Sequence, residues 1–242
     1  MIGSVIHRFD EIGSTNDEAR VLADKGAVEG TIVTACYQTH GRGSRGRMWL
    51  SPPGVNLLFS VILRPNLPLY RIGELAFVFA CGTANALRDA FGLDVRVKWP
   101  NDIVVNLRKI GGIIIEAGSG FAIVGVGLNI NWTDFPSEIA ASATSVAMEI
   151  GETVDIENAF RRVISGLDSA YTEYREDGFG KILHNWRKLD CCLGMGVEVE
   201  IDGRVVRGKS AGVDDCGSLL VETSSGAVEC IPAVSCVLRW DG

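Results

Sequence analysis

The sequence predicts a mixed α+β fold, in which a mainly antiparallel sheet with flanking helices is followed by a small C-terminal β-barrel. Between residues 31 and 130, short β-rich runs are joined by tight polar or glycine-containing turns and are interrupted by helical periodicity. From Val197 onward, short alternating runs are separated by glycine turns, as in a small barrel. The character of the sequence changes between Cys191 and Gly196, so we expect one domain of residues 1–190 and a second of residues 191–242.

Local sequence patterns predict the order of the helices and strands. A helix is expected over residues 14–25, because Ser14 and Thr15 each precede an acidic residue by three positions and Gly26 supplies a stop. Apolar residues at helical spacing predict a longer helix over residues 71–91, before Gly92. The remaining predicted helices span residues 155–174 and 179–189, and the predicted strands span residues 31–37, 57–63, 95–98, 103–105, 110–116 and 121–130. Tight turns among the last four strands favour an antiparallel or mixed sheet.

Composition and charge narrow the class of protein. With 47% hydrophobic and 22% charged residues, the chain of 242 residues is typical of a packed globular protein and is long enough for one large domain and one small one. The net charge of −7 argues against a general nucleic-acid-binding protein, which normally carries a basic face. The sequence has no apolar run long enough to span a bilayer. We therefore expect neither a DNA partner nor a membrane partner.

Cysteines and histidines argue against a disulfide framework and against a metal held by side chains. The seven cysteines are an odd number without a CxxC pair, and the N-terminus has no secretory signal, so reduced thiols and a cytoplasmic location are expected. His7, His40 and His184 lack metal-ligand spacing, and no metal ligand is assigned. The sequence has no Walker or GxSxG motif, so any nucleotide must be held by another device.

Three permanent positive charges, Arg42, Arg45 and Arg47, lie among glycines in the segment GRGSRGR, residues 41–47. Glycine lets the backbone approach a ligand closely, and arginine forks pair with phosphate or carboxylate. A solvated, flexible loop is the alternative, but the flanking segments TIVTACYQ and MWLS are typical of buried structure, which favours a site for a polyanion. Because the loop has little apolar anchorage, we expect it to become ordered when its ligand binds.

Two further segments carry polar groups whose role stays open on residue type alone. Ser14, Thr15 and Asn16 are typical of a helix N-cap, and the same hydroxyl and amide groups suit a polar ligand. Asn129, in the run GVGLNIN, either reads the edge of an adenine or ends the strand and begins a loop. The glycines of this run are not a dinucleotide fingerprint, since no helix follows them.

The segment KWPND, residues 98–102, places a cation, an aromatic ring and an acid at the end of an apolar strand. Asp102 either caps a turn or serves a site, because strand ends and loops are where sites tend to lie. A hairpin would bring Lys109 back beside Asp102, and a lysine there can neutralise charge while a carboxylate attacks a phosphate. A solvent-exposed hairpin lysine is the alternative.

Taken in order, the segments STN, Q-x-x-GRGxRGRxW, KWPND, RKIGGI and GVGLNIN resemble the biotin protein ligases over essentially the whole chain. The resemblance implies a class II aminoacyl-tRNA-synthetase-like catalytic domain followed by an SH3-like β-barrel. It implies that biotin and ATP, accompanied by Mg²⁺, give biotinyl-5'-AMP, which a lysine of a biotin carboxyl carrier protein or domain then attacks. Too few residues precede Ser14 for the DNA-binding domain of some members, so we expect the non-repressor type.

The resemblance also assigns site residues and leaves alternatives. It implies biotin binding by Ser14, Thr15, Asn16, Gln38, Gly41, Arg42, Lys109 and Gly112. It implies ATP or adenylate binding by Arg45, Arg47, Trp49, Asn101, Lys109 and Asn129, and catalysis by Lys109, Arg42, Arg47 and Asp102. Ser44 departs from the family pattern, which usually has an arginine there, and so removes a cation. The alternatives are a lipoate or octanoate ligase of the same fold and a silent biotin-binding regulator; glycine-rich strands and an exposed sheet edge are compatible with a homodimer.

Overall fold

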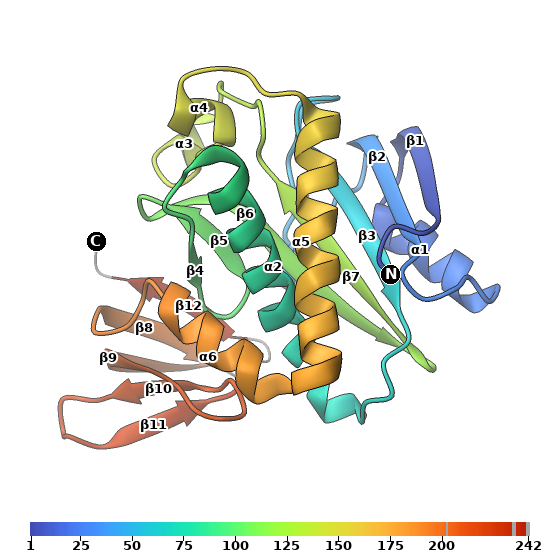
Figure 1. Cartoon of the computed structure of the whole chain (residues 1–242). Coiled ribbons are helices and arrows are strands. Elements are labelled where there is room, and N and C mark those ends of the chain that lie inside the picture. Colours follow the sequence, from blue (N-terminus) through green and yellow to red (C-terminus); the bar gives the residue numbers. More distant parts are fainter. Residues whose placement is uncertain (202, 234–235, 241–242) are drawn as a thin grey trace.

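The computed structural model describes residues 1–201, 203–233 and 236–240, without the side chains of residues 45 and 236–240. A seven-stranded sheet, in the order β1-β2-β3-β7-β6-β5-β4, forms its centre (Figure 1). The strands are β1 Ile6–Ile12, β2 Ile32–Gln38, β3 Leu57–Leu63, β4 Arg96–Lys98, β5 Asp102–Val105, β6 Arg108–Gly118 and β7 Phe121–Leu128. The β1–β2 pair is parallel and the other pairs are antiparallel. The predicted mainly antiparallel sheet is confirmed.

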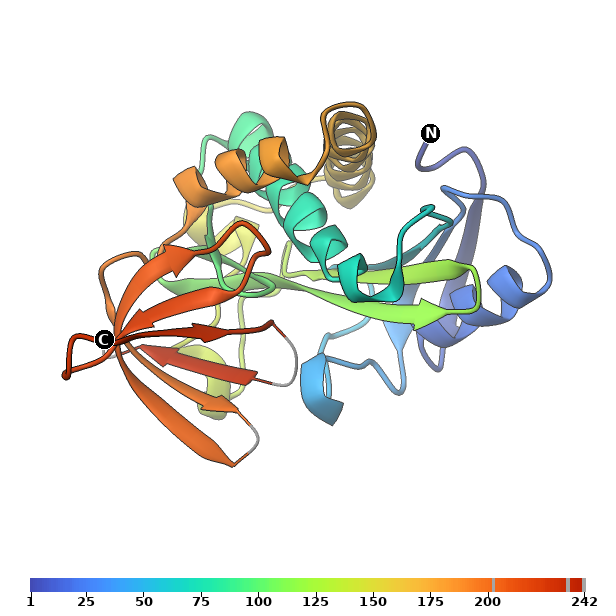
Figure 2. The same cartoon turned by 90° about the horizontal axis from the view of Figure 1, so that it is seen from below.

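Helices cover the two faces of this sheet unequally. The longer helices α2 (Glu74–Phe91), α5 (Ile156–Asp177) and α6 (Phe179–Leu189) lie on one face, while α1 (Thr15–Asp24) lies on the other (Figures 1 and 2). The shorter helices are η1 Ser44–Gly46, η2 Leu69–Arg71, α3 Ser137–Ala140 and α4 Val146–Ile150. The short α1 packs against β2, β3 and β7. None of the described helices is long and apolar enough to cross a membrane.

A second sheet follows helix α6. Its five antiparallel strands have the order β11-β10-β9-β8-β12, and they are β8 Gly196–Ile201, β9 Arg204–Val213, β10 Leu219–Glu222, β11 Val228–Ile231 and β12 Cys236–Trp240. It packs beside β4, where the Trp99 indole Nε1 donates to the Gly217 carbonyl at 2.9 Å and Cys191 N donates to the Val97 carbonyl at 3.0 Å. One hydrophobic core runs through both sheets. The division into domains at residue 190 stays a prediction.

Most predicted elements are present, and two details differ from expectation. Strand β3 and helix α6 have the predicted bounds, and Gly92 ends α2 in the left-handed conformation at φ 66°. Strand β1 was not predicted, because its side chains are exposed or half-buried along its length and it therefore lacks a buried apolar face. Ser14 occupies the N-cap position of α1, but its hydroxyl makes no capping hydrogen bond. The side chains of Thr15 and Asn16 are buried and form hydrogen bonds with residues of the sheet.

Candidate active site

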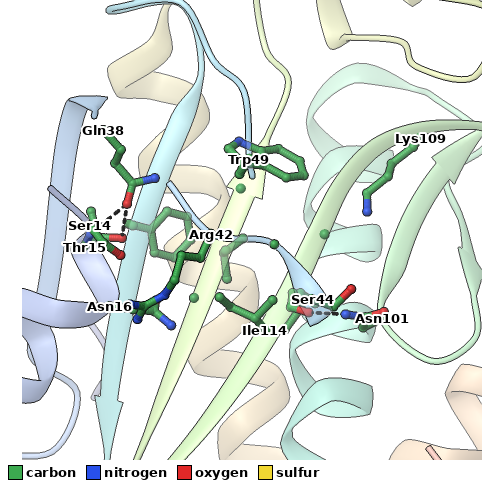
Figure 3. A pocket seen from close by; sticks show the side chains of 17 residues that line it. Ser14, Thr15, Asn16, Gln38, Arg42, Ser44, Trp49, Asn101, Lys109 and Ile114 are labelled. Carbon is green, nitrogen blue, oxygen red and sulfur yellow. Dashed lines mark hydrogen bonds between the residues drawn. The ribbon is translucent and has the colours of Figure 1, made fainter. Parts of the chain in front are cut away.

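A narrow pocket lies where the N-terminus of α1 meets the sheet (Figure 3). Its empty volume, including the open mouth, is about 450 Å³. The residues that line it are Ser14, Thr15, Asn16, Gln38, Arg42, Gly43, Ser44, Trp49, Phe59, Asn101, Lys109, Gly112, Ile113, Ile114, Gly125, Val126 and Gly127. The structure therefore brings together residues from all five of the predicted segments, although they are far apart in the sequence.

Hydrogen bonds at one end of this pocket fix the orientation of the Gln38 amide. Gln38 Oε1 accepts from Thr15 N at 2.7 Å and from Thr15 Oγ1 at 3.0 Å. A backbone N–H can only donate, so the amide oxygen faces Thr15 and the Nε2 donor faces away from it. A Cβ atom at Gly41 would lie 3.3 Å from this Nε2, so glycine there lets the loop pass closely. This end of the pocket offers a fixed donor to a ligand acceptor.

The floor of the pocket is made by two glycines of β7. A Cβ atom at Gly125 would overlap Asn16 Oδ1, and a Cβ atom at Gly127 would lie 2.6 Å from the Trp49 ring. These glycines lie two positions apart on one face of the strand, which allows a side chain to rest directly on the backbone. The sequence analysis did not predict that the glycines of GVG provide a surface on which other side chains pack. Alternate glycines inside a strand are the signal that predicts close approach.

Lys109 and Asp102 form the predicted pair at the β5–β6 hairpin. Lys109 Nζ donates to Asp102 Oδ1. The ammonium group also lies 5.6 Å from the centre of the Trp49 ring, within the range of a cation–π contact. The Lys109 backbone pairs with residues 142–144, because its N–H donates to Ser142 O and its carbonyl accepts from Thr144 N. Both the main chain and the side chain of Lys109 are therefore held in place.

A second, wider pocket opens on the other side of Lys109 and Trp49. Its empty volume is about 860 Å³, and its walls are mostly apolar. The lining residues are Gly43, Ser44, Arg47, Met48, Trp49, Leu50, Lys109, Asn129, Trp132, Phe135, Ile139, Ser142 and Ala143. The rings of Trp132 and Phe135 are 4.3 Å apart between their centres. Aromatic walls of this kind suit a flat, partly apolar group.

The two asparagines of the predicted adenylate site lie in different pockets. Asn129 lines the wide pocket, and its Nδ2 donates to Thr144 O at 3.0 Å. It therefore both forms part of the pocket wall and holds the loop that contains Thr144. Asn101 lines the narrow pocket, and its Nδ2 donates to the Ile113 carbonyl. Both amide nitrogens are thus occupied by the backbone. Each nitrogen carries a second hydrogen, and each residue therefore combines a backbone contact with a place in a pocket wall.

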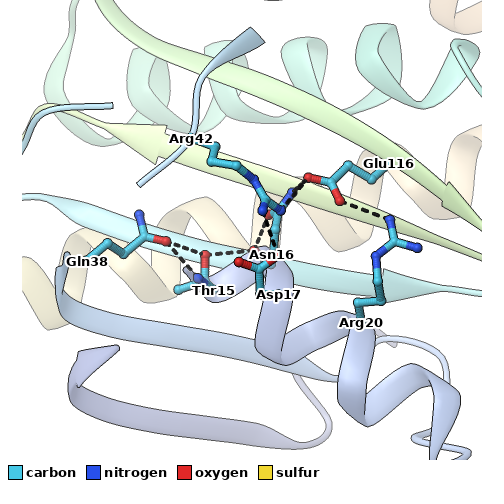
Figure 4. Close-up of polar contacts among 8 residues, drawn as sticks. Thr15, Asn16, Asp17, Arg20, Gln38, Arg42 and Glu116 are labelled. Carbon is cyan, nitrogen blue, oxygen red and sulfur yellow. Dashed lines mark hydrogen bonds and ion pairs between the residues drawn. The ribbon is translucent and has the colours of Figure 1, made fainter. Parts of the chain in front are cut away.

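The arginines of the 41–47 loop differ in their partners. Arg42 pairs with Asp17 at 2.7 Å and with Glu116 at 2.9 Å (Figure 4). Burial opposes the charge of Arg42, but hydrogen bonds and Coulomb attraction from these two carboxylates outweigh it and raise its pKa. Arg47 instead donates to the carbonyl and hydroxyl of Ser44 at 3.4 and 3.2 Å, within the loop itself. The side chain of Arg45 lies outside the part of the molecule that the structure describes.

The described residues contain no group of three or more His, Cys, Asp or Glu side chains that could hold a metal ion. Sequence reasoning also missed Glu116, Ser60 and Arg20, which lie in the polar network behind the narrow pocket. Glu116 is a charged residue at the end of the apolar run IGGIII, where a half-buried carboxylate requires partners. That position was the available signal. Ser60 gives none, because it lies in an otherwise apolar strand.

Comparison with known proteins identifies the class to which this fold and these joined pockets belong. The model of the biotin/lipoate A/B protein ligase family matches residues 11–131, and the model of the biotin protein ligase C-terminal domain matches residues 193–239. The chain belongs to the biotin/lipoate A/B protein ligase family.

Individual relatives agree with this assignment. The bifunctional ligase/repressor BirA of Bacillus subtilis is 33% identical over 93% of this chain and 72% of that protein. The biotin--[acetyl-CoA-carboxylase] ligase of Paracoccus denitrificans is 33% identical over 91% of this chain and 95% of that protein. The solved biotin protein ligase from Aquifex aeolicus, in complex with biotin and ATP, superposes with a TM-score of 0.89 and 26% identity over 98% of this chain and 100% of that one.

Proposed function

We propose that this chain is an ATP-dependent biotin ligase, which forms biotinyl-5'-AMP from biotin and ATP and then transfers biotin to a lysine of a biotin carboxyl carrier protein or domain. One observation carries the proposal: a narrow polar pocket and a wide apolar pocket share Lys109 and Trp49 as lining residues. A carboxylic acid in the first and a nucleotide in the second would meet at the lysine. The names of the relatives, which include biotin ligases of known structure, support this reaction.

The narrow pocket is the site that we assign to biotin. Ser14, Thr15, Asn16 and Gln38 supply polar groups for its ring system, and Gly112 lets the backbone pass close to it. Gly41, which is not among the lining residues, lets the loop pass close to Gln38. A Cβ atom at Gly112 would lie 3.1 Å from Lys109 Nζ, so glycine leaves room for the ammonium group beside a bound carboxylate. The apolar residues Phe59 and Ile114 suit the aliphatic chain.

The wide pocket is the site that we assign to the nucleotide. Trp132 and Phe135 suit the adenine, and Trp49, Asn129 and Lys109 line the same pocket. Arg47, on the rim, is the loop cation that we assign to the phosphates, together with Arg45. Mg²⁺ would enter with ATP and be held chiefly by the phosphates, because magnesium usually binds through substrate phosphates with one or two carboxylates, and the described residues form no cluster of acidic side chains that could hold it.

The first chemical step joins biotin to the α-phosphate. A biotin carboxylate oxygen attacks the α-phosphorus, the bond to the β-phosphate oxygen breaks, and pyrophosphate leaves with that electron pair. Two anions must approach each other, so a fixed positive charge at their meeting point lowers the barrier. Lys109 is the residue that we assign to this role, since its ammonium group is oriented by Asp102.

The second step moves biotin from the adenylate to the carrier. The lysine amine attacks the acyl carbon, a C–N bond forms, the C–O bond to AMP breaks, and the amine loses a proton. Asp102 is the carboxylate that we assign to orient the incoming amine. We further propose that residues 191–242 form an SH3-like domain, that the enzyme works in the cytoplasm, where its cysteines stay reduced, and that a homodimer is compatible with the exposed edge strand β1.

The direct test is to incubate the protein with biotin, ATP, Mg²⁺ and a biotin carrier domain and to measure the mass of the carrier. Addition of one biotinyl group is expected, together with ATP–pyrophosphate exchange that biotin stimulates and octanoate does not. Exchange that responds to octanoate alone would instead assign the chain to the lipoate branch of its family. A carrier domain whose acceptor lysine is replaced by arginine is the matched control, and it should gain no mass.

A further inference from the structure

Glu116 lies at the centre of a polar network behind the narrow pocket, although none of the expected motifs includes it. It lies on β6, on the same face as Gly112 and Ile114, which line the pocket. Its carboxylate accepts three hydrogen bonds of 2.9 Å, from Asn16 Nδ2 and Arg42 Nη2 to one oxygen and from Arg20 Nη2 to the other. Figure 4 shows these partners converging on Glu116 from α1 and from the loop.

The surroundings of Glu116 favour its ionised form. Its side chain is 25% exposed, and burial alone would disfavour ionisation. Hydrogen bonds from Asn16, Arg20 and Arg42 outweigh burial and lower the pKa of this carboxyl. An ionised carboxylate accepts hydrogen bonds and donates none, so it can orient any group that both donates and accepts.

One arm of the network runs from Glu116 to the recognition end of the pocket. Because Asn16 Nδ2 must donate to the carboxylate, Asn16 Oδ1 faces Ser60, whose hydroxyl lies in hydrogen-bond contact with it. The same hydroxyl lies 2.8 Å from Thr15 Oγ1, and because it has a single hydrogen it donates to only one of these two oxygens at a time. Thr15 Oγ1 in turn donates to Gln38 Oε1 at 3.0 Å. The absence of a Cβ at Gly125 gives the Asn16 amide the space to take part. The chain of contacts therefore joins Glu116 to the donor that Gln38 presents.

The second part of the network attaches the 41–47 loop to the sheet and to α1 through Arg42. Arg42 spans from the start of the 41–47 loop to β6 and α1, through Glu116 and Asp17. With Arg20, these residues form a group of two positive and two negative charges, so Arg42 is balanced by carboxylates before any ligand arrives. Arg42 thus acts on the ligand from a fixed position. The later part of the loop has no such ion pair among the described residues, since the Arg47 side chain donates to Ser44 within the loop itself.

We infer that Glu116 is a positioning residue for biotin, which sets the orientation of the Asn16 amide and holds Arg42 over the narrow pocket. The inference rests on the proposed function, since it concerns the same reaction. Glu116 touches neither reacting atom in this arrangement, and its effect passes through Asn16 and Arg42. Its loss should therefore change the use of biotin more than the use of ATP.

The test compares Glu116→Gln with two carboxylate variants, in biotin-dependent ATP–pyrophosphate exchange and in direct titration of biotin by calorimetry. Glu116→Gln is expected to raise the KM and the Kd for biotin by about tenfold and to change the KM for ATP by less than about twofold, because a charged hydrogen-bond acceptor is lost. Asp17→Asn, which removes only the other partner of Arg42, should give a smaller rise. Asp24→Asn, which changes an exposed carboxylate at the end of the same helix, should leave both values unchanged.

A double-mutant cycle separates positioning from general loosening of the fold. In an Arg42→Gln background, Glu116→Gln should weaken biotin binding by less than about threefold further. Glu116 acts through Asn16 and Arg42, and its contact with Arg42 is already absent in that background. Glu116→Gln with unchanged biotin affinity, or with biotin and ATP affected alike, would overturn the inference, as would independent effects of the two substitutions. Failure of the proposed function looks different, because the unmodified protein would then show no biotin-dependent exchange at all.

Discussion

The two pockets are built on different parts of the fold. The narrow pocket takes most of its polar groups from α1, β2 and β6 and its floor from β7, with Arg42 and Asn101 added from loops, and hydrogen bonds join Thr15 to Gln38 and Asn16 to Glu116. The wide pocket takes most of its walls from residues 47–50 and 132–143, which belong to loops and to the short helix α3. Preorganised groups on regular elements favour selectivity, and loop walls permit movement. We expect the narrow pocket to determine which acid is used and the wide one to adjust around the nucleotide.

The largest loss of activity is expected at Lys109, which lines both pockets. Lys109→Ala should reduce biotin-dependent ATP–pyrophosphate exchange by about 100-fold, because a preoriented charge at the reacting atoms is removed. The melting temperature should change little, since the paired Lys109 side chain is one-third exposed and such pairs contribute little to stability. Exchange rates and thermal melts of the two proteins check this. A large fall in melting temperature with proportionate loss of activity would make Lys109 a structural residue instead.

Two substitutions on β7 would distinguish the pockets from each other. Gly125→Ala should raise the KM for biotin by roughly tenfold and spare ATP, because the new methyl group displaces the Asn16 amide from its hydrogen bonds. Gly127→Ala should raise the KM for both substrates, because it displaces Trp49, which lines both pockets. Steady-state kinetics with each substrate varied in turn measure this. Identical profiles for the two variants would contradict the separation of the sites.

The parts of this architecture that the sequence predicts are those with a local signal. Strand β3 is fully buried and Gly92 stops α2 in a left-handed conformation, so both follow from residue type alone. Strand β1 escapes prediction because an edge strand exposed along its length has no apolar face, and its place is set by pairing with β2.

In the candidate site, too, contacts with a local sequence signal could be predicted and contacts between distant segments could not. The meeting of Lys109 and Asp102 is predictable because a short hairpin must bring them together. The attachment of Arg42 to Glu116 is not, since the two are far apart in the sequence and only the pairing of β6 with β7, together with the packing of α1, brings them into contact. The sequence of the loop shows only that it has little apolar anchorage. The structure shows that its first arginine is held in place.

A cation introduced at Ser44, which lines both pockets, should act chiefly on retention of the adenylate. Ser44→Arg is expected to slow release of the adenylate by about fivefold or less, because an exposed charge pair contributes at most about 1 kcal/mol. The substitution also removes the Ser44 hydroxyl from Arg47, so Ser44→Ala is the control for that loss. Single-turnover release of labelled adenylate, measured without a carrier, gives the rates. Equal release from all three proteins would exclude this position from the retention of the intermediate.

The smallest effect concerns the charge that supports the narrow pocket. The pKa of Glu116 in the folded protein is lowered from its ordinary value of 4.5, because hydrogen bonds from Asn16, Arg20 and Arg42 overcome the cost of burial. An acid with a lowered pKa contributes stability that is fully present above its unfolded value and is lost as the pH falls through the folded one. The free energy of unfolding should therefore differ between the protein and Glu116→Gln by a constant amount from pH 8 to about 5.5. That difference should shrink below pH 4.5, which urea titrations of both proteins at several pH values would measure. A difference that grows in acid would mean that the carboxylate is held against its preference, and the narrow pocket would then have to be supported by the neutral hydrogen bonds of Thr15 and Gln38 alone.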